Sequence, residues 1–200
     1  ISKFYLIIGL TLMKVTVEIK GKENLPKDSP FVIISNHQSL WDIPIYLINT
    51  NVQLSFIAKK ELRKIPILGW AIEYSGHFLI DRSKPREAIK ELSKIAKKVT
   101  KDRCIIIFPE GTRSEDNTIK KFKRGAFQLA IDANVPVVPC HIEGSGKFLP
   151  KKSLLMNPSK ITITIEKPIL IKSLDTTKSK KEVETELSNK THKIISNINN

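Results

Sequence analysis

The stretch "SNHQSLWDIP", residues 35–44, places His37 five positions before Asp42, directly after the apolar run "FVII". A histidine that is neutral near pH 7 can accept a proton, and a carboxylate can hold its ring and stabilise the imidazolium. The two side chains can meet if a strand ends at Asn36 and a helix begins near Asp42. The pair is then a candidate general base with its orienting partner. In the alternative interpretation, Asp42 only caps a helix and His37 only satisfies a turn.

A second group of polar residues, "FPEGTRS" at 108–114, follows the apolar run "CIIIF". In open α/β sheets, ligands bind outside the carboxyl ends of the strands. Arginine makes bidentate contacts with phosphate, and backbone N–H groups near a glycine help to cradle an anion. The segment therefore predicts a phosphate-binding site, whereas its alternative is a polar turn with an incidental ion pair. The candidate ligands are Glu110, Gly111, Thr112 and Arg113.

The third candidate segment, "GHFLIDRS" at 76–83, again ends an apolar run with charged residues. Arg82 can supply a second positive group for the same anion if its strand end lies near Arg113. Asp81 is equally suited to a capping or ion-pairing role. His77, inside this run, and His141, in "PCHIEG", are expected to be packed histidines and not ligands.

Several reaction types lack their sequence signatures. The chain has no Gly-x-Ser-x-Gly elbow, no phosphate-loop signature and no dinucleotide-binding glycine pattern. It also has no His-Glu-x-x-His or Cys-x-x-Cys pair for a metal. Cys104 and Cys140 each lie in an apolar run and are expected to be buried, reduced thiols. A histidine base without a protein nucleophile favours direct transfer to a substrate hydroxyl, with no covalent enzyme intermediate.

The elements that position these residues follow from the apolar pattern. Short β-branched runs alternate with helical periodicities at 85–101, 124–133 and 179–197, which predicts an α/β domain with a largely parallel central sheet flanked by helices. Several runs are apolar throughout, as in strands that are covered on both faces. The predicted strands span 14–19, 31–35, 54–58, 77–80, 104–108, 135–142 and 161–166.

The composition indicates an anionic partner. The 200 residues include 34 basic and 20 acidic residues, for a net charge of +14, so nucleic acid, anionic lipid and phosphorylated substrates are all candidates. Residues 4–13, "FYLIIGLTLM", are shorter than the roughly 20 apolar residues of a spanning helix. They suit a core element or the remnant of a longer apolar segment, and we favour the second.

Four segments taken in order resemble the sequence blocks of the glycerophospholipid acyltransferase family, specifically the bacterial 1-acylglycerol-3-phosphate acyltransferases. Together they cover roughly residues 15–170. The segments are "NHQSLWD" (36–42), "KKELRKIPILGWAIEYSGHFLIDR" (59–82), "FPEGTRS" (108–114) and "VPVVPC" (135–140).

This resemblance implies a glycerol-3-phosphate acyltransferase-like fold and the transfer of an acyl group from acyl-CoA or acyl carrier protein to the free hydroxyl of lysophosphatidic acid. The product would be phosphatidic acid, made in phospholipid biosynthesis without a cofactor or metal. His37 would be the general base and Asp42 its partner. The glycerol phosphate would be held by Glu110, Gly111, Thr112 and Arg113, with Arg82 and Lys59 adding positive charge.

The resemblance also implies an organisation and a location. Residues 1–13 would be the remnant of an N-terminal membrane-associating segment, 14–172 the catalytic domain and 173–200 a C-terminal covering helix. An anionic membrane surface would be a partner, at the cytoplasmic face of the inner membrane.

Three alternatives stay open. Relatives also act on other lysolipids, and an inactive lipid-binding protein could keep the same fold, although such a protein need not retain both His37 and Asp42. A basic nucleic-acid-binding module would use the same net charge. The 6% aromatic content and the lack of interleaved basic and aromatic residues argue against nucleic acid.

Overall fold

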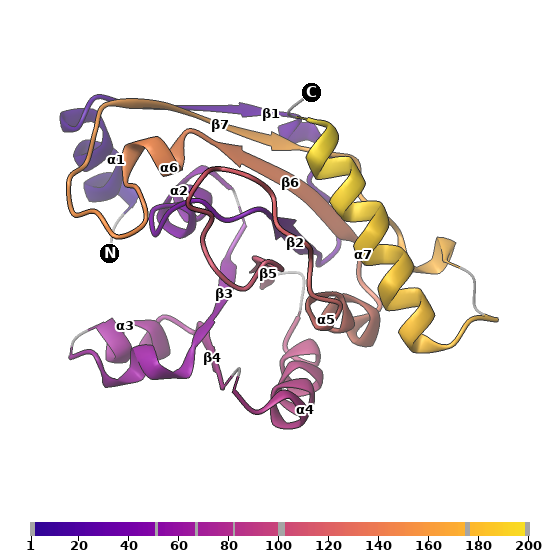
Figure 1. Cartoon of the computed structure of the whole chain (residues 1–200). Coiled ribbons are helices and arrows are strands. Elements are labelled where there is room, and N and C mark those ends of the chain that lie inside the picture. The colour runs from indigo at the N-terminus through magenta and orange to yellow at the C-terminus, as the bar shows by residue number, and fades with distance from the viewer. Residues whose placement is uncertain are drawn as a thin grey trace.

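The computed structural model describes residues 3–50, 52–66, 68–81, 83–99, 103–174 and 177–198. Seven strands form one sheet in the order β1-β7-β6-β2-β5-β3-β4 (Figure 1). Every neighbouring pair of these described strands is parallel except β6 and β7, which run antiparallel. The strands are β1 (Val15–Lys20), β2 (Val32–Ser35), β3 (Leu54–Lys59), β4 (Phe78–Ile80), β5 (Cys104–Ile107), β6 (Val137–Glu143) and β7 (Ser159–Ile165).

The central strands are apolar throughout because helices cover both faces of the sheet. Successive side chains of a strand point to opposite faces. Ile33 of β2 and Ile106 of β5 belong to the core on one face, whereas Ile34 and Ile107 belong to the core on the other. All four residues are buried. A parallel sheet enclosed in this way is the α/β architecture that the apolar runs predict.

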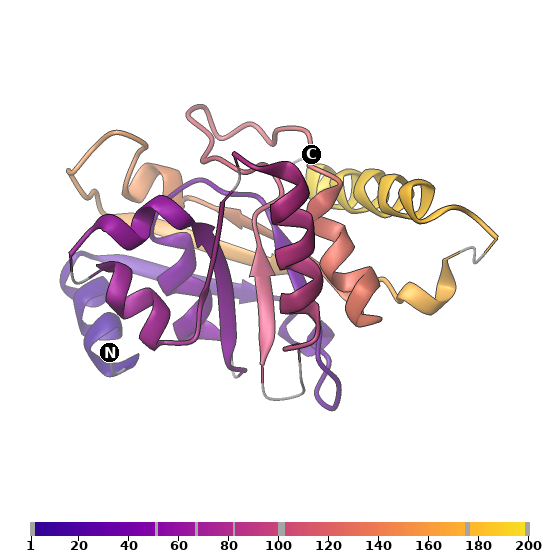
Figure 2. The same ribbon diagram turned by 90° about the horizontal axis from the view of Figure 1, so that it is seen from below.

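The helices divide between the two faces of the sheet (Figures 1 and 2). α1, α2 and α3 contribute buried residues to the core that contains Ile33, and α4, α5 and α7 contribute to the core that contains Ile34. The helices are α1 (Lys3–Leu12), α2 (Asp42–Asn49), α3 (Leu68–Tyr74), α4 (Pro85–Ala96), α5 (Gly125–Ala133), α6 (Ser145–Phe148) and α7 (Lys180–Asn197), with 3₁₀ turns at Lys22–Asn24, Lys60–Lys64 and Ile171–Ser173.

The C-terminal helix α7 packs against α5 and β6. Its start is stabilised by a capping box, in which Ser179 and Glu182 each accept a backbone N–H of the other. Its own Leu187 and Ile195 are fully buried. The predicted helix at 179–197 is therefore confirmed, and it covers one face of the sheet.

All seven predicted strands are present, with ends that differ by one or two residues. Helix α4 ends at Ala96 and not at 101, and Ile89 is 47% exposed, so Ala88 and not Ile89 packs against the core before Leu92. The short helices α3 and α6 were not predicted, because four to seven residues show too little periodicity. Among the described residues, no helix has the length and apolar character needed to cross a bilayer.

Candidate active site

The candidate residues meet at one edge of the sheet because the strands that carry them are adjacent and parallel. Ile34 of β2 pairs with Ile107 of β5, so His37 and Glu110 each lie three residues beyond a matched pair. Lys59 ends β3, the next strand after β5, and pairs with Ile80 of β4. The carboxyl ends of four neighbouring strands thus place the three candidate segments side by side.

His37 and Asp42 meet as predicted. The Nδ1 atom of His37 lies 2.7 Å from Oδ2 of Asp42, which is completely buried. The same oxygen accepts the backbone N–H groups of Gln38 at 2.8 Å and Ser39 at 3.0 Å. These bonds point back into the loop before α2, and no side chain caps the start of that helix. Asp42 therefore orients the histidine loop, which is more than the capping role of the alternative interpretation.

The ring of His37 is held on its flat side as well. It stacks on Phe108, the residue after β5, with the ring centroids 4.1 Å apart and an interplanar angle of 19°. Its side chain is 15% exposed. In the neutral tautomer whose Nδ1–H donates to Asp42, the lone pair is on Nε2. The arrangement leaves Nε2 as the atom that can take a proton from a bound substrate.

The polar residues around His37 attach its loop to the rest of the sheet edge. The side-chain amide of Asn36 donates to the carbonyl of Ile142 in β6 and accepts the Ile142 N–H, both at 2.8 Å. Ser39 Oγ donates to the carbonyl of Leu149, after α6, at 3.0 Å. Sequence reasoning assigned no role to Asn36 and Ser39. The only sequence signal for them is their density beside the histidine, directly after a buried strand.

Glu110 makes contacts that differ from those expected of a phosphate ligand. Its Oε1 accepts the backbone N–H of His37 at 2.8 Å, and its Oε2 accepts the N–H of Lys120 at 3.1 Å. The side chain is 4% exposed. Burial raises the pKa of the carboxyl, and the two backbone donors oppose that rise. Glu110 therefore links the loop after β5, in which it lies, to the loop after β2.

The remaining candidates of this segment lie at the surface of the same loop. Gly111 has φ 75°, a conformation that suits glycine, and the ammonium of Lys123 lies where a side chain would begin. Thr112 is exposed and Arg113 is partly exposed. The Ser114 N–H donates to the carbonyl of His37 at 2.8 Å, which binds this loop to the histidine loop. Lys123 was missed by sequence reasoning, because nothing in the chain order predicts that it folds back over Gly111.

Two further predicted cations are Lys59 and Arg82. Lys59 is exposed at the end of β3, on the edge that carries His37 and the Gly111 loop. Arg82 lies outside the described residues. Its neighbour Asp81 accepts the N–H of Ser83 at 3.0 Å and the Ser83 hydroxyl at 2.6 Å, and these bonds lower the pKa of Asp81. Asp81 thus forms a local turn, and it does not cap α4, whose start at Pro85 has no side-chain cap.

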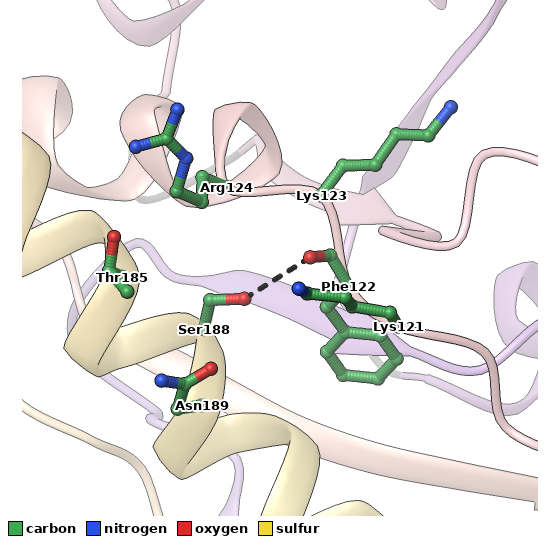
Figure 3. A pocket seen from close by; sticks show the side chains of 7 residues that line it. All are labelled: Lys121, Phe122, Lys123, Arg124, Thr185, Ser188 and Asn189. Atoms are coloured by element: carbon green, nitrogen blue, oxygen red, sulfur yellow. Dashed lines mark hydrogen bonds between the residues drawn. The ribbon is translucent and has the colours of Figure 1, made fainter.

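A basic hollow of about 440 Å³ lies between the segment before α5 and one face of α7 (Figure 3). Ser188 of α7 donates to the carbonyl of Phe122 at one side of it. Neither His37 nor Asp42 is in its lining, so the hollow is separate from that pair. Its lining consists of Lys121, Phe122, Lys123, Arg124, Thr185, Ser188 and Asn189.

Other chemically reactive side chains are buried or partly buried. His77 stacks on Phe56 with the ring centroids 3.8 Å apart, and burial lowers its pKa to about 4. His141 is also buried, and its pKa is lowered by burial. Cys104 and Cys140 are buried free thiols whose pKa values are raised by burial. Within the described parts of the chain, no three His, Cys, Asp or Glu residues gather in a way that could hold a metal ion.

A known protein family matches the part of the chain that contains these candidate residues. The sequence profile described as "Acyltransferase" matches residues 16–143, a span that includes His37, Asp42 and the Glu110–Arg113 segment. The chain belongs to the acyltransferase family. The family resemblance expected from the four sequence blocks is therefore confirmed.

Individual members of the family also match this chain. The chain is 40% identical over 154 residues to a chloroplast 1-acyl-sn-glycerol-3-phosphate acyltransferase of Brassica napus, covering 76% of this chain and 44% of that protein. It is 38% identical over 149 residues to the 1-acyl-sn-glycerol-3-phosphate acyltransferase of Pseudomonas aeruginosa, covering 74% and 57%. The chain thus spans about half the length of these curated relatives.

A solved structure shares the fold of this acyltransferase. The 1-acyl-sn-glycerophosphate (LPA) acyltransferase PlsC from Thermotoga maritima superposes with a TM-score of 0.76 at 32% sequence identity. The match covers 96% of this chain and 77% of that one. The predicted α/β fold with a largely parallel sheet is confirmed by this likeness and by the strand order.

Proposed function

We propose that this acyltransferase moves an acyl group from a thioester donor to the free hydroxyl of lysophosphatidic acid, making phosphatidic acid for phospholipid biosynthesis. The observation that carries the proposal is the His37–Asp42 pair, held 2.7 Å apart beside a loop that offers Arg113 and exposed backbone to an anion. The acceptor class comes from the relatives, which are named for 1-acyl-sn-glycerol-3-phosphate.

In the proposed mechanism, Nε2 of His37 takes the proton from the acceptor hydroxyl as its oxygen attacks the thioester carbonyl carbon. The new C–O bond forms, the C–S bond breaks, and the proton passes from the imidazolium to the leaving thiolate. Asp42 keeps the proton on Nδ1 and stabilises the positive ring during this step. Both cysteines are buried with raised pKa values, which supports direct transfer without a thiol nucleophile.

The phosphate of the acceptor would lie against the loop after β5. Arg113 can bind it through two N–H groups, and the backbone around Gly111 and the hydroxyl of Thr112 can donate to it. Lys123, whose ammonium lies against Gly111, adds a positive charge on one side. Lys59, and Arg82 from the neighbouring strand end, would add positive charge from the other.

Glu110 has a different role in this proposal. Its two oxygens already accept backbone N–H groups, and a carboxylate repels phosphate. We therefore assign Glu110 as a positioning residue that fixes the position of His37 relative to the loop after β5. The Gly111 N–H already donates to the Phe108 carbonyl at 3.1 Å, so the phosphate contacts are left mainly to Thr112 and Arg113.

The donor would be acyl-CoA or an acylated carrier protein, and no other cofactor is needed. Both donors present negative charge close to the thioester arm. Lys121, Lys123 and Arg124 form a basic stretch along the hollow shown in Figure 3, and Lys123 also touches the site loop at Gly111. We assign this stretch to the donor's phosphate or acidic groups. It also accounts for part of the net charge of +14 without nucleic acid.

The acceptor is a lipid, so the proposed place of action is a membrane surface with anionic headgroups, at the cytoplasmic face of the inner membrane. Lysine and arginine side chains near such a surface each gain about 1 kcal/mol of attraction. Figure 1 places α1, which includes most of the apolar stretch 4–13, at one end of the molecule.

The test offers the purified protein a panel of lysolipids together with acyl-CoA and with acylated carrier protein, and identifies products by mass. We expect acylation of lysophosphatidic acid that is lost in His37→Ala, while the thermal unfolding temperature stays close to wild type. A wild-type rate in His37→Ala would refute the base. Preferred acylation of another lysolipid would reassign the acceptor and leave the chemistry intact.

The anion loop is tested by Arg113→Ala with Arg86→Ala as the matched control, since Arg86 is an exposed arginine on α4. We expect Arg113→Ala to raise KM for lysophosphatidic acid about 10- to 100-fold, as loss of a charge-assisted bidentate contact would. Arg86→Ala should leave KM unchanged. Equal kinetics in the two variants would exclude Arg113 as the phosphate ligand.

A further inference from the structure

The loop between α6 and β7 exposes three consecutive large apolar side chains. Leu154 is 95% exposed, Leu155 is 77% exposed and Met156 is 45% exposed. Single exposed apolar residues are ordinary in soluble proteins, whereas a contiguous run at a loop tip indicates a surface that another phase or partner covers. Residues 151–156 are called the apolar loop below.

Local hydrogen bonds hold the tip of the apolar loop in its outward position. The N–H of Leu155 donates to Ser153 Oγ at 3.0 Å, and the N–H of Ser153 donates to the carbonyl of Pro150 at 3.1 Å. At the far side, the N–H of Asn157 donates to the carbonyl of Phe148 at 2.8 Å. The turn is therefore built with its leucines facing away from the sheet core.

The base of the apolar loop is joined directly to the catalytic loop. Ser39, two residues after His37, donates its hydroxyl to the carbonyl of Leu149 at 3.0 Å. The ring of Trp41 packs edge-on against Phe148 with the centroids 5.3 Å apart. Leu40, between these two contacts, is 58% exposed. The apolar loop and the histidine loop are thus in direct contact at their bases, and the exposed Leu40 lies beside that contact.

The charge around the apolar loop suits an anionic surface. Residues 144–160 contain four lysines and no acidic residue. Glu115 pairs with Lys151 at 2.9 Å and Lys152 at 3.4 Å, and Glu18 pairs with Lys160 at 2.7 Å. Two carboxylates therefore offset only part of the charge of the four lysines. The lysine side chains can reach headgroup phosphates while the apolar tip enters the acyl region.

A second apolar element lies at the same end of the molecule. In both views α1 and the loop that precedes β7 lie at the end opposite α7, and Figure 2 shows that loop on the same edge of the sheet as the loop after β5. Helix α1 carries no acidic residue. Its most exposed apolar side chains are Phe4, Tyr5, Ile7 and Leu12, at 51–79%.

We propose that the apolar loop is a membrane wedge, which inserts Leu154, Leu155 and Met156 into the headgroup–acyl boundary of an anionic lipid layer. The wedge sets the mouth of the His37 site against the membrane, so that a lysolipid presents its hydroxyl to Nε2 without leaving the layer entirely. This inference rests on the proposed function in one respect, the lipid nature of the acceptor. The insertion itself does not require turnover.

The test measures sedimentation of the protein with phosphatidylcholine vesicles, with and without phosphatidylglycerol. We expect the wild type and His37→Ala to bind the anionic vesicles equally, and Leu154→Ser/Leu155→Ser to bind about 10- to 100-fold more weakly, as loss of two buried leucines would. The matched control is Ile89→Ser/Leu170→Ser, which removes two other exposed apolar side chains, at 47% and 54% exposure. Equal binding by the wedge variant and the control would overturn the proposal.

A site-directed probe locates the contact. An environment-sensitive dye on Leu155→Cys should shift to the blue with anionic vesicles, and one on Leu170→Cys should not. The native Cys104 and Cys140 are buried, so the dye reaches only the new thiol. A concentration-dependent dimer that Leu154→Ser/Leu155→Ser abolishes, with vesicle binding unchanged, would assign the loop to a second copy of the chain and overturn the wedge.

The wedge and the proposed function fail in different ways. With monomeric, short-chain lysophosphatidic acid, Leu154→Ser/Leu155→Ser should keep the wild-type kcat, whereas on vesicle-embedded substrate its rate should fall with its binding. Absence of product from every protein and every lysolipid would refute the activity alone. An equal loss of rate on both substrate forms would refute the wedge.

Discussion

Glu110 and His37, 73 residues apart in the chain, are joined by a 2.8 Å hydrogen bond in which the buried carboxylate accepts the histidine's backbone N–H. The bond joins the loop after β5 to the loop after β2, so the loop that offers Arg113 and the loop that carries His37, the proposed base, form one unit. This hydrogen bond forms because β2 and β5 are neighbours in the sheet, so the sequence of either segment alone does not predict it.

Replacing Glu110 tests this link between the two loops. In Glu110→Gln a single carbonyl oxygen remains, so either the His37 or the Lys120 N–H faces an amide NH₂ group and loses its acceptor. We expect kcat to fall about 10- to 100-fold through misplacement of the base, with KM for lysophosphatidic acid little changed. Steady-state kinetics with both substrates separate the roles. A rise in KM for the acceptor with kcat preserved would instead make Glu110 a phosphate-site residue.

Asp42→Asn should separate catalysis from stability. Oδ2 of Asp42 accepts the imidazole and two backbone N–H groups, whereas Oδ1 is buried with no hydrogen-bond partner among the described residues. A neutral amide lowers the cost of burying a charge but cannot stabilise the imidazolium. We expect kcat to fall about 10²- to 10⁴-fold while the unfolding temperature does not decrease.

The control for that variant is Asp132→Asn on α5, where the carboxylate pairs with Lys180 of α7. It should leave kcat unchanged and lower stability slightly. A large loss of stability in Asp42→Asn, in proportion to its loss of activity, would reduce Asp42 to a structural residue.

Asn36→Asp probes the attachment of the histidine loop to β6. An aspartate can still accept the Ile142 N–H but places a second acceptor against the Ile142 carbonyl. We expect the free energy of unfolding to fall by about 1–3 kcal/mol, as for a buried polar group left unpaired. Urea denaturation measures the change. The control Asn49→Asp loses one hydrogen bond to the Ile45 carbonyl on a half-buried helix, so its free energy of unfolding should fall by less. An equal fall in the two variants would show that the Asn36–Ile142 pairing does not stabilise the fold more than that single bond.

The partly buried His77 predicts a dependence of stability on pH. Burial lowers its pKa from 6.5 to about 4, so between these values the unfolded chain binds more protons than the folded chain. The free energy of unfolding therefore falls as the pH is lowered from about 6.5 to about 4. Urea denaturation across that interval should show a smaller fall in His77→Gln than in the wild type. Parallel curves for the two proteins would place His77 in solvent contact.

The sequence by itself determined the elements and the chemistry-bearing residue types. Runs such as "CIIIF" are apolar and β-branched enough to predict buried strands, and the five-residue spacing of His37 and Asp42 predicted a base and its partner. Local patterns carry this information because burial and side-chain period depend on neighbouring residues in the chain. The short helices α3 and α6 escaped prediction for the same reason, since they are too brief to show a period.

Only the tertiary structure decided which segments meet. The strand order β2-β5-β3-β4 brings the strand ends that precede His37, Glu110 and Lys59 to one edge of the sheet, and no local pattern encodes that order. In the folded chain Glu110, which the sequence predicted as a phosphate ligand, instead links two loops. Asn36 gains a partner in β6, and Lys123 lies over Gly111. The physical reason is that an apolar run states how deeply a strand is buried, whereas the strand beside it depends on how the whole chain packs.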